Sequence, residues 1–117
     1  HIPGIQNQLQ IFRKINKLLS PIGIAIISFW RFLDVPRLAS KVVPSDKLIN
    51  LGIEKGELDQ NDYILDWDRG VSAYRYCHYY SDDEINYLVK ESKFNLLAEY
   101  FADGKEGKGN KYIIISK

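Results

Sequence analysis

Apolar residues recur every three or four positions near the start of the chain, with mostly polar residues between them. The apolar positions are Ile5, Leu9, Phe12, Ile15 and Leu19. This spacing places them on one face of a helix. Pro3 suits the first turn of a helix, and residues 20–23, which include Pro and Gly, are typical of a helix end. The pattern therefore predicts an amphipathic helix that begins near Pro3 and ends at about Leu19.

An almost entirely apolar run follows at residues 24–30, and most of its residues favour strands. A short continuous run of this kind is typical of a strand that is buried on both faces, as in a parallel sheet. A helix, a tight turn and a buried strand together form the return leg of a βαβ unit. We therefore expect residues 24–30 to form a parallel strand.

The pattern is less regular over residues 31–70. Pro36 and Pro44 interrupt any long element, residues 46–51 have room for one helical turn, and residues 56–61 are acidic and loop-like. A connection of this length inside a compact domain usually has a function of its own. We expect a substrate-side insertion at 31–70, within one domain that spans residues 1–117.

The last third of the chain contains three local signals. Residues 71–80 are rich in Tyr and suit an extended segment, and Ser81 with Glu84 forms a capping box for a helix that reaches about Lys93. Residues 94–101 and 111–116 are predicted strands, joined by a turn at 103–110. The glycines at 104, 107 and 109 superficially suggest a phosphate loop. Such a loop needs a helix after it, and a strand follows here, so the pattern predicts a hairpin turn.

The predicted elements define an α/β fold. Their order is helix, strand, insertion, helix, strand, strand, which matches the second half of a doubly wound sheet with an antiparallel edge. We therefore expect the C-terminal part of a Rossmann-like sheet, made of one parallel strand and a terminal antiparallel hairpin, with helices.

Charge is unevenly distributed along the chain, although the net charge is +1. Residues 1–50 hold seven Lys and Arg against two Asp and Glu, and residues 51–117 hold nine against thirteen. The basic half could face a polyanion such as RNA, or the halves could be two solvated surfaces. Cys77 is the single cysteine, which fits a reducing cytosol. The apolar stretch at 18–29 is too short to span a bilayer, so we expect a cytoplasmic protein without membrane contact.

The densest chemistry lies at residues 74–80. In an extended strand, Arg75 shares one face with Cys77 and Tyr79, and the remaining residues, Tyr74, Tyr76, His78 and Tyr80, share the other. Arg offers a planar fork for a carboxylate or phosphate, His a proton or hydrogen bond, and Tyr a stacking surface. A half-buried structural strand would show the same residues. His1 and His78 lack the spacing of a metal site, and we expect none.

Residues 75–80, followed by Asp83-Glu84-Ile85 and Phe94, resemble the tRNA wobble-uridine carboxymethyl methyltransferases. This family includes the methyltransferase domain fused to AlkB-type oxygenases. Residues 19–23 resemble its turn, although Ile22 replaces the usual glycine, and residues 26–30 resemble its fifth strand, which ends in Trp. The similarity is weak over residues 31–62. The chain would thus be the C-terminal part of a class I S-adenosylmethionine-dependent methyltransferase.

The resemblance implies methyl esterification of a carboxymethyl uridine in tRNA. It gives catalytic roles to Arg75 and His78, and substrate contacts to His1, Trp30, Tyr76 and Tyr80. S-adenosylmethionine would be the cofactor, but the family's acidic-glycine loop lies upstream and has no counterpart here. The partners implied are tRNA and a small zinc-binding activator subunit.

Two other functions fit the sequence. One is a methyltransferase that acts on a small molecule, which the acidic second half favours. The other is a non-catalytic binding or assembly module. Without a cofactor half, the strand at 24–30 would expose an edge, and the chain could associate with itself.

Overall fold

The computed structural model describes residues 1–67 and 73–117. Its first helix, α1 (Ile5–Leu18), confirms the amphipathic pattern, because Leu9 and Phe12 are buried while most polar positions are exposed. Gly4 precedes the helix with a φ of 83°, a conformation that glycine adopts without strain. The chain then turns at residues 20–23, where the Gly23 N–H donates to the Ser20 carbonyl, and enters the sheet.

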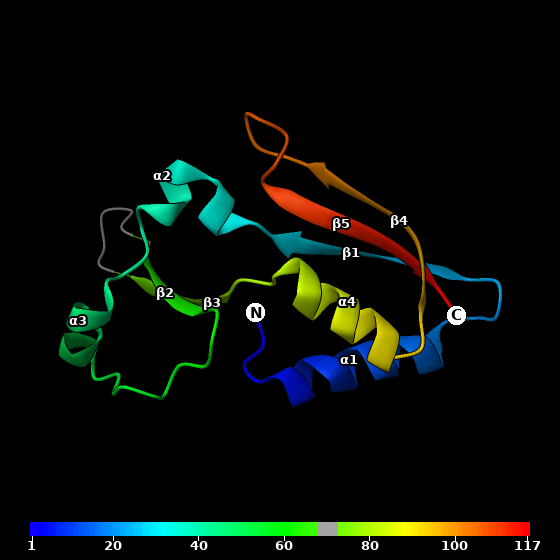
Figure 1. Cartoon of the computed structure of the whole chain (residues 1–117), viewed down its shortest axis with the longest axis horizontal. Coiled ribbons are helices and arrows are strands. Elements are labelled where there is room, and N and C mark those ends of the chain that lie inside the picture. Colours follow the sequence, from blue (N-terminus) through cyan, green and yellow to red (C-terminus); the bar gives the residue numbers. More distant parts are fainter. Residues whose placement is uncertain (68–72) are drawn as a thin grey trace.

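Three antiparallel strands form the larger sheet. They are β1 (Ile24–Trp30), β4 (Asn95–Ala102) and β5 (Asn110–Ser116), in the order β1-β5-β4. Figure 1 shows the C-terminal strand, in red, running between the other two. The predicted hairpin of the last two strands is confirmed, with a bulge between Leu96 and Ala98. The central strand is thus the last one in the sequence.

The prediction of a parallel strand at residues 24–30 is wrong. The strand exists with the expected bounds, but its only partner among the described residues is β5, and that pairing is antiparallel. Nor is the strand buried on both faces. Ala25, Ile27 and Phe29 face the helices, whereas Ile24 and Ile26 are 55% and 59% exposed. A mostly apolar strand does not reveal whether its second face is covered, since that depends on segments distant in sequence.

The helices α1 and α4 (Asp82–Glu91) cover one face of this sheet (Figure 1). The capping box predicted for α4 is present: the Glu84 N–H donates to Ser81 Oγ, and the Glu84 carboxylate accepts from the Ser81 N–H. The main core lies between the helices and the sheet and consists of Leu9, Phe12, Phe29, Ile85, Leu88, Val89, Phe94, Ile113 and Ile115.

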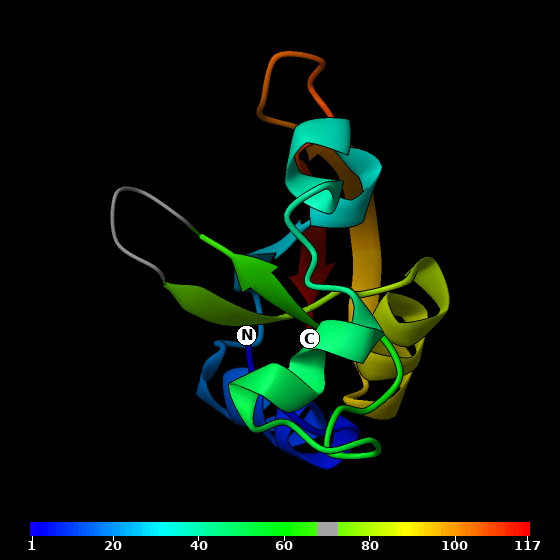
Figure 2. The same cartoon turned by 90° about the vertical axis from the view of Figure 1, so that its left-hand side faces the viewer.

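Residues 31–67 contain more regular structure than their sequence suggested. A 3-10 turn η1 (Phe32–Asp34) and the short helices α2 (Pro36–Ala39) and α3 (Ser45–Leu48) precede a second 3-10 turn, η2 (Ile49–Leu51). The strand β2 (Asp62–Asp66) then pairs antiparallel with β3 (Tyr74–His78). Figure 2 looks onto these elements, which lie at the end of the molecule away from the C-terminus. Val71 and Ser72, in the predicted extended segment, lie outside the described residues.

A second core lies inside this region. Phe32, Leu38, Leu65 and Cys77 are its buried members, and Leu65 and Cys77 come from adjacent strands. Cys77 therefore has a packing role, and burial raises the pKa of its thiol. Residues 31–67 and β3 thus share a packed core that continues directly from the end of β1, and a substrate-side role for residues 31–70 stays a prediction.

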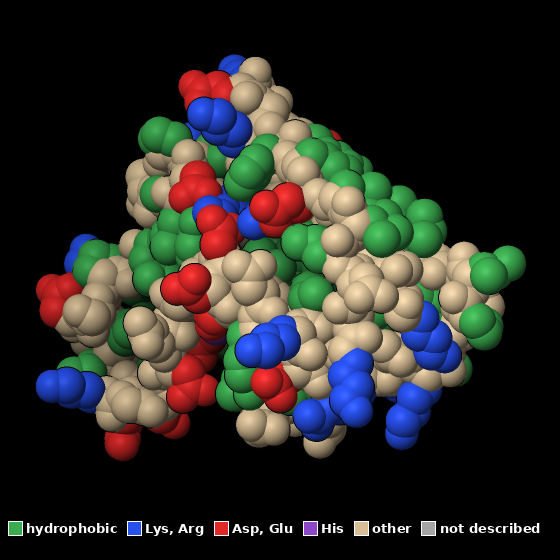
Figure 3. All heavy atoms as spheres, turned by 45° about the vertical axis from the view of Figure 1, so that its right-hand side comes forward, with side chains coloured by type: hydrophobic (Ala, Val, Ile, Leu, Met, Phe, Trp, Pro, Cys, Tyr) green, Lys and Arg blue, Asp and Glu red, His purple; other side chains and the backbone are tan. Residues whose placement is uncertain are grey.

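Hydrophobic side chains are also prominent on the surface. Figure 3 shows them in a band on the side where β4 lies, and Lys and Arg side chains along the lower edge, where α1 lies. Leu96, Leu97, Tyr100 and Phe101 of β4 are all more than 40% exposed. Across residues 1–67 and 73–117, no helix has the length and apolarity required to cross a membrane.

Candidate functional site

A cavity of about 610 Å³ lies beyond the end of β1. Three separate segments form it: residues 30–38, Trp67 after β2, and the turn between β4 and β5. The lining residues are Trp30, Asp34, Val35, Pro36, Arg37, Leu38, Trp67, Asp103, Gly104, Lys105, Glu106, Lys108, Gly109 and Asn110. A concave surface with aromatic walls and a few charged groups is the usual form of a ligand site.

Two tryptophans form the aromatic part of the cavity. The rings of Trp30 and Trp67 lie 6.0 Å apart between centroids, nearly perpendicular to each other at 74°. Phe32, which is fully buried, packs behind Trp30 at 5.2 Å. His1 contacts Trp30 from another side, at 5.9 Å. These contacts hold the Trp30 ring in place at the C-terminal end of β1, where it lines the cavity.

Two cations lie over the ring of Trp67. The Arg75 guanidinium carbon is 5.2 Å from the ring centroid, and the Lys41 Nζ is 5.7 Å away. Both distances are within the range of a cation–π interaction. Arg75 is itself exposed. No motif surrounds Trp67 in the sequence, yet this residue connects the cavity to Arg75.

The glycine-rich turn on the other side of the cavity is braced at its base. Asp103 accepts hydrogen bonds from Asn110 Nδ2 at 2.8 Å and from the Tyr112 hydroxyl at 2.5 Å. The Gly109 N–H donates to the Asp103 carbonyl, and the Arg31 N–H donates to the Gly109 carbonyl, both at 2.9 Å. A Cβ at position 109 would lie 3.1 Å from the Asp103 oxygen. The predicted hairpin turn is confirmed, and its ends are fixed relative to η1.

His78 is not among the residues that line the cavity, and it lies in a buried network with two carboxylates. Its Nδ1 is 2.6 Å from Asp62 Oδ1, and its Nε2 is 2.9 Å from Glu84 Oε1. Both ring nitrogens therefore have a carboxylate oxygen within hydrogen-bond distance, and the tautomer decides which nitrogen donates. The Tyr76 hydroxyl donates to the same Asp62 oxygen at 2.7 Å. Desolvation, followed by this bond, raises the pKa of Tyr76.

Tyr80 connects this network to the main core. Its ring is 4.7 Å from that of His78 and 5.0 Å from that of Phe29. Burial raises the pKa of Tyr80 to about 12, with Glu84 and Asp62 adding to the shift. Its carbonyl oxygen accepts a hydrogen bond from Arg31. Because its pKa is raised, the Tyr80 side-chain hydroxyl stays protonated at neutral pH.

The structure divides the residues selected from the sequence into two groups. Tyr76, His78 and Tyr80 lie together, as the strand alternation predicted. His1 belongs to the same group, because the backbone N–H of His78 donates to its Nδ1 at 3.2 Å. Arg75 lies on the opposite face of β3, against Trp67. Trp30 joins the groups through its ring contacts with His1 and Trp67. The catalytic and binding roles of all six residues stay predictions.

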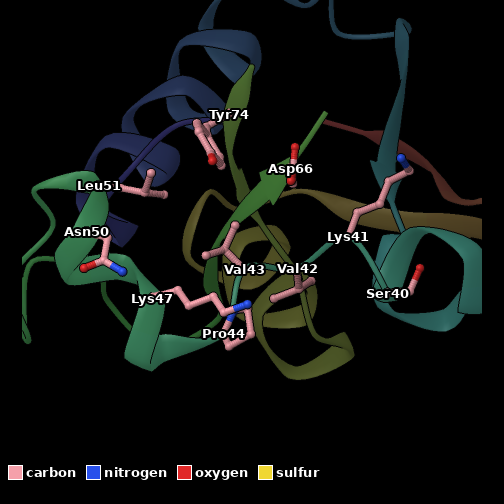
Figure 4. Close-up of a pocket in the computed structure, with 10 residues that line it drawn as sticks. All are labelled: Ser40, Lys41, Val42, Val43, Pro44, Lys47, Asn50, Leu51, Asp66 and Tyr74. Carbon is pink, nitrogen blue, oxygen red and sulfur yellow. The ribbon is translucent and has the colours of Figure 1, made fainter. Parts of the chain in front are cut away.

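A second hollow, of about 460 Å³, lies between β2, β3 and the α3–η2 segment. Figure 4 shows Lys41, Lys47, Asn50, Asp66 and Tyr74 around it. Asp66 Oδ1 is buried and accepts no hydrogen bond from the described residues. None of the six residues selected from the sequence lines this hollow, whereas Trp30 lines the first cavity, so we regard the first cavity as the stronger candidate site.

The described residues do not form a cradle for S-adenosylmethionine of the kind that the resemblance implies. That cradle needs a strand, a glycine loop and a helix in succession, so that backbone N–H groups face the ligand. The glycines at 104, 107 and 109 instead connect two antiparallel strands.

Comparisons with known proteins identify the type of fold. No protein-family model and no curated protein matches this chain. Among solved structures, the chain is similar to an S-adenosylmethionine-dependent methyltransferase from Clostridium acetobutylicum ATCC 824, with a TM-score of 0.59 and 9% sequence identity. The match covers 98% of this chain and 52% of that protein, so the chain spans about half the length of the structure it matches. At this identity the likeness shows a shared methyltransferase-like α/β fold. The wobble-uridine family stays a prediction.

Proposed function

We propose that this chain is the substrate-binding half of a cytoplasmic S-adenosylmethionine-dependent methyltransferase. The observation that carries the proposal is the fold likeness, which extends over 98% of the chain. The proposed substrate is a carboxymethyl uridine at the wobble position of tRNA, whose carboxylate becomes a methyl ester. The basis for this substrate is the sequence resemblance at residues 75–80, which includes Arg75 and three aromatic residues.

The open edge of the larger sheet supports the proposal that this chain is one half of a larger methyltransferase domain. β1 has no second strand partner among the described residues, although its seven residues are in strand conformation. Half of the similar solved structure also has no counterpart in this chain. A cofactor-binding half that added a strand to β1 would satisfy the free backbone groups of that edge.

Arg75 is the proposed anchor for the substrate carboxylate. A guanidinium presents parallel N–H groups that match the two oxygens of a carboxylate. Such a substrate is already ionised near neutral pH, so the residue needs to orient it and not to remove a proton. For His78, a direct role requires that one ring nitrogen exchange its carboxylate partner, Asp62 or Glu84, for the substrate. Tyr76, Tyr80, His1 and Trp30 would then shape the surrounding surface.

Two experiments test the proposal. Calorimetric titration of the 117-residue chain with S-adenosylhomocysteine should show no binding, because the described residues lack the cofactor cradle. In an enzyme that also contains the proposed cofactor half, Arg75→Ala should lose methyl transfer to tRNA while its unfolding midpoint stays close to that of the wild type. Arg13→Ala, on the exposed face of α1, is the matched control. Full activity of Arg75→Ala would overturn the assignment.

A second candidate function is a non-catalytic assembly module. Exposed Ile24 and Ile26 on the open face of β1 favour it, because contiguous apolar surface usually marks an interaction site. Light scattering after size-exclusion chromatography separates the two ideas. A stable oligomer that binds no tRNA would favour assembly. A small-molecule methyltransferase, in contrast, would show no salt-dependent tRNA binding.

A further inference from the structure

An aromatic ring holds two cations of the chain. The Arg75 guanidinium carbon lies 5.2 Å from the ring centroid of Trp67, and the Lys41 Nζ lies 5.7 Å from the same centroid. Across residues 1–67 and 73–117, neither cation has a carboxylate within ion-pair distance or a side-chain hydrogen bond. Their side-chain N–H groups therefore have no acceptor in the part of the chain that the structure describes.

A buried arginine of the same chain is held in a different way. The Arg31 guanidinium lies 2.7 Å from Asp34 and 3.5 Å from Asp82. Such carboxylates position a cation, but they also occupy its hydrogen-bond donors. An indole ring attracts a cation through its face, and the N–H groups along the edge of a guanidinium stay available. Arg75 and Lys41 are thus positioned by Trp67 and keep their donors for a ligand.

The Trp67 ring is itself held in place. Its backbone N–H donates to the Ala73 carbonyl at 2.7 Å, and its ring packs 6.0 Å from that of Trp30. The side chain is also partly buried against the second core. A ring fixed in this way restricts the conformations open to Arg75, so a ligand loses less free energy in ordering that side chain.

The carboxylate next to Trp67 in the sequence lies on the other face of the β2–β3 hairpin. Asp66 is opposite Tyr74, and Leu65 is opposite Arg75. Successive residues of a strand alternate between the two faces, and residues directly opposite each other share a face. Asp66 and Tyr74 therefore share the face that Arg75 does not occupy, and both line the second hollow. Asp66 thus leaves the charge of Arg75 available.

From these contacts we infer that Trp67 is a positioning residue, and that the two cations held by its ring, Arg75 and Lys41, bind the oxyanion of a ligand, either a carboxylate or a phosphate. Arg75 supplies a planar fork of donors, and Lys41 supplies a second positive charge at the same ring. The oxyanion site rests on the geometry at Trp67. Its use for a substrate carboxylate rests on the proposed function, in which Trp67 and Lys41 have no role.

The Arg75 side chain can be observed directly by nuclear magnetic resonance. The 117-residue chain is labelled with ¹⁵N, and the Nε–H signal of Arg75 is assigned through its loss in Arg75→Gln. Acetate and inorganic phosphate are the probes, titrated separately at constant ionic strength so that general screening does not change. We expect a saturable shift of the Arg75 signal with at least one of the two oxyanions. The signal of Arg13, which is exposed on α1, should show no saturable shift.

Substitutions separate the role of the ring from that of the charges. Lys41→Gln should weaken oxyanion binding about fivefold, because one attractive charge is lost. Trp67→Leu should weaken it about fivefold, because the guanidinium is no longer held, whereas Trp67→Phe keeps an aromatic face and should stay within about twofold of the wild type. Lys47→Gln, at an exposed position of α3, is the matched control and should bind as the wild type. Circular dichroism verifies that each variant is folded.

Three results would overturn the inference. They are no saturable Arg75 shift with either oxyanion, wild-type affinity in both Lys41→Gln and Trp67→Leu, or a loss in Trp67→Phe as large as that in Trp67→Leu. Saturation by phosphate and not by acetate would support the oxyanion site and contradict the carboxylate substrate of the proposed function. Saturation by acetate, in a chain whose extended enzyme transfers no methyl group, would leave this site standing and refute the proposed function.

Discussion

At the scale of single residues, the His78 network shows how a residue chosen for chemistry can be committed to structure. His78 is 4% exposed, and both of its ring nitrogens have carboxylate partners. The sequence indicated its face of the strand, because Tyr76 and Tyr80 lie at alternate positions. It could not indicate Asp62, which meets His78 only because β2 pairs with β3 in one particular register.

Asp62 should be important for stability. Its Oδ1 accepts from the Tyr76 hydroxyl and contacts His78, and its Oδ2 accepts from the Asp59 N–H. Asp62→Ala leaves buried polar groups unpaired, and we expect the free energy of unfolding to fall by about 2–3 kcal/mol. Urea unfolding measures the change. Asp59→Ala, at an exposed position three residues away, should cost little. Equal stability of the two variants would contradict the role given to the network.

At the scale of elements, the sequence correctly predicted features that depend on neighbouring residues, but it did not predict contacts between distant segments. The capping box and the terminal hairpin follow from residues close together in sequence. The antiparallel pairing of β1, in contrast, joins Ile24 to Ser116, and no local pattern specifies a partner so far away. The cavity was missed for the same reason, because Trp30, Trp67 and Lys105 come from three separate segments.

The start of α4 provides a test of the cap. Ser81 Oγ accepts the Glu84 N–H, which would otherwise have no partner in the first turn. Ser81→Ala should lower the free energy of unfolding by about 1 kcal/mol. Ser81→Thr should keep most of the stabilisation that the cap provides, because threonine also caps helices. Thermal unfolding followed by circular dichroism measures both. A loss in the threonine variant as large as that in the alanine variant would argue against capping as the cause.

Lys111 links three elements and should shape the pH dependence of stability. Its ammonium, on β5, lies 2.8 Å from Asp82 on α4 and 3.1 Å from Glu99 on β4. The hydrogen bond to Lys111 lowers the pKa of Asp82 against the opposing effect of burial. For Lys111, burial disfavours the charged form, but the bonds and charges of Asp82 and Glu99 outweigh it and raise the pKa.

These shifts set two pH windows. Stability from Asp82 is present above its ordinary pKa of 3.8 and is lost as pH falls through the lower folded value. Stability from Lys111 is present below its ordinary pKa of 10.5 and is lost as pH rises through the higher folded value. Lys111→Met should therefore flatten the stability profile at both ends, as measured by urea unfolding. Lys90→Met, on exposed α4, should keep the wild-type profile. An unchanged profile in Lys111→Met would refute the linkage.

At the scale of the whole molecule, the part of the chain that the structure describes covers only one face of the larger sheet. Ile26 and Ile27 are neighbours in β1, yet Ile26 points to the open face and Ile27 packs against the main core. Ile26→Lys should reduce self-association, measured by light scattering, and leave the fold intact. Ile27→Lys should unfold the chain, because it buries a charge without a partner. If Ile26→Lys also unfolds the chain, the open face is needed for stability and is no interface.

The position of β5 has a consequence for synthesis on the ribosome. The strand at the centre of the sheet is the last to be made, and about eighty residues separate Trp30 from its partner Asn110. At typical elongation rates of 5–20 residues per second, β1 waits roughly 4 to 16 s before that partner exists. Throughout that interval, the edge of this apolar strand that β5 later covers is available to other nascent chains. The protein should therefore depend on chaperones during translation more than its small size would indicate.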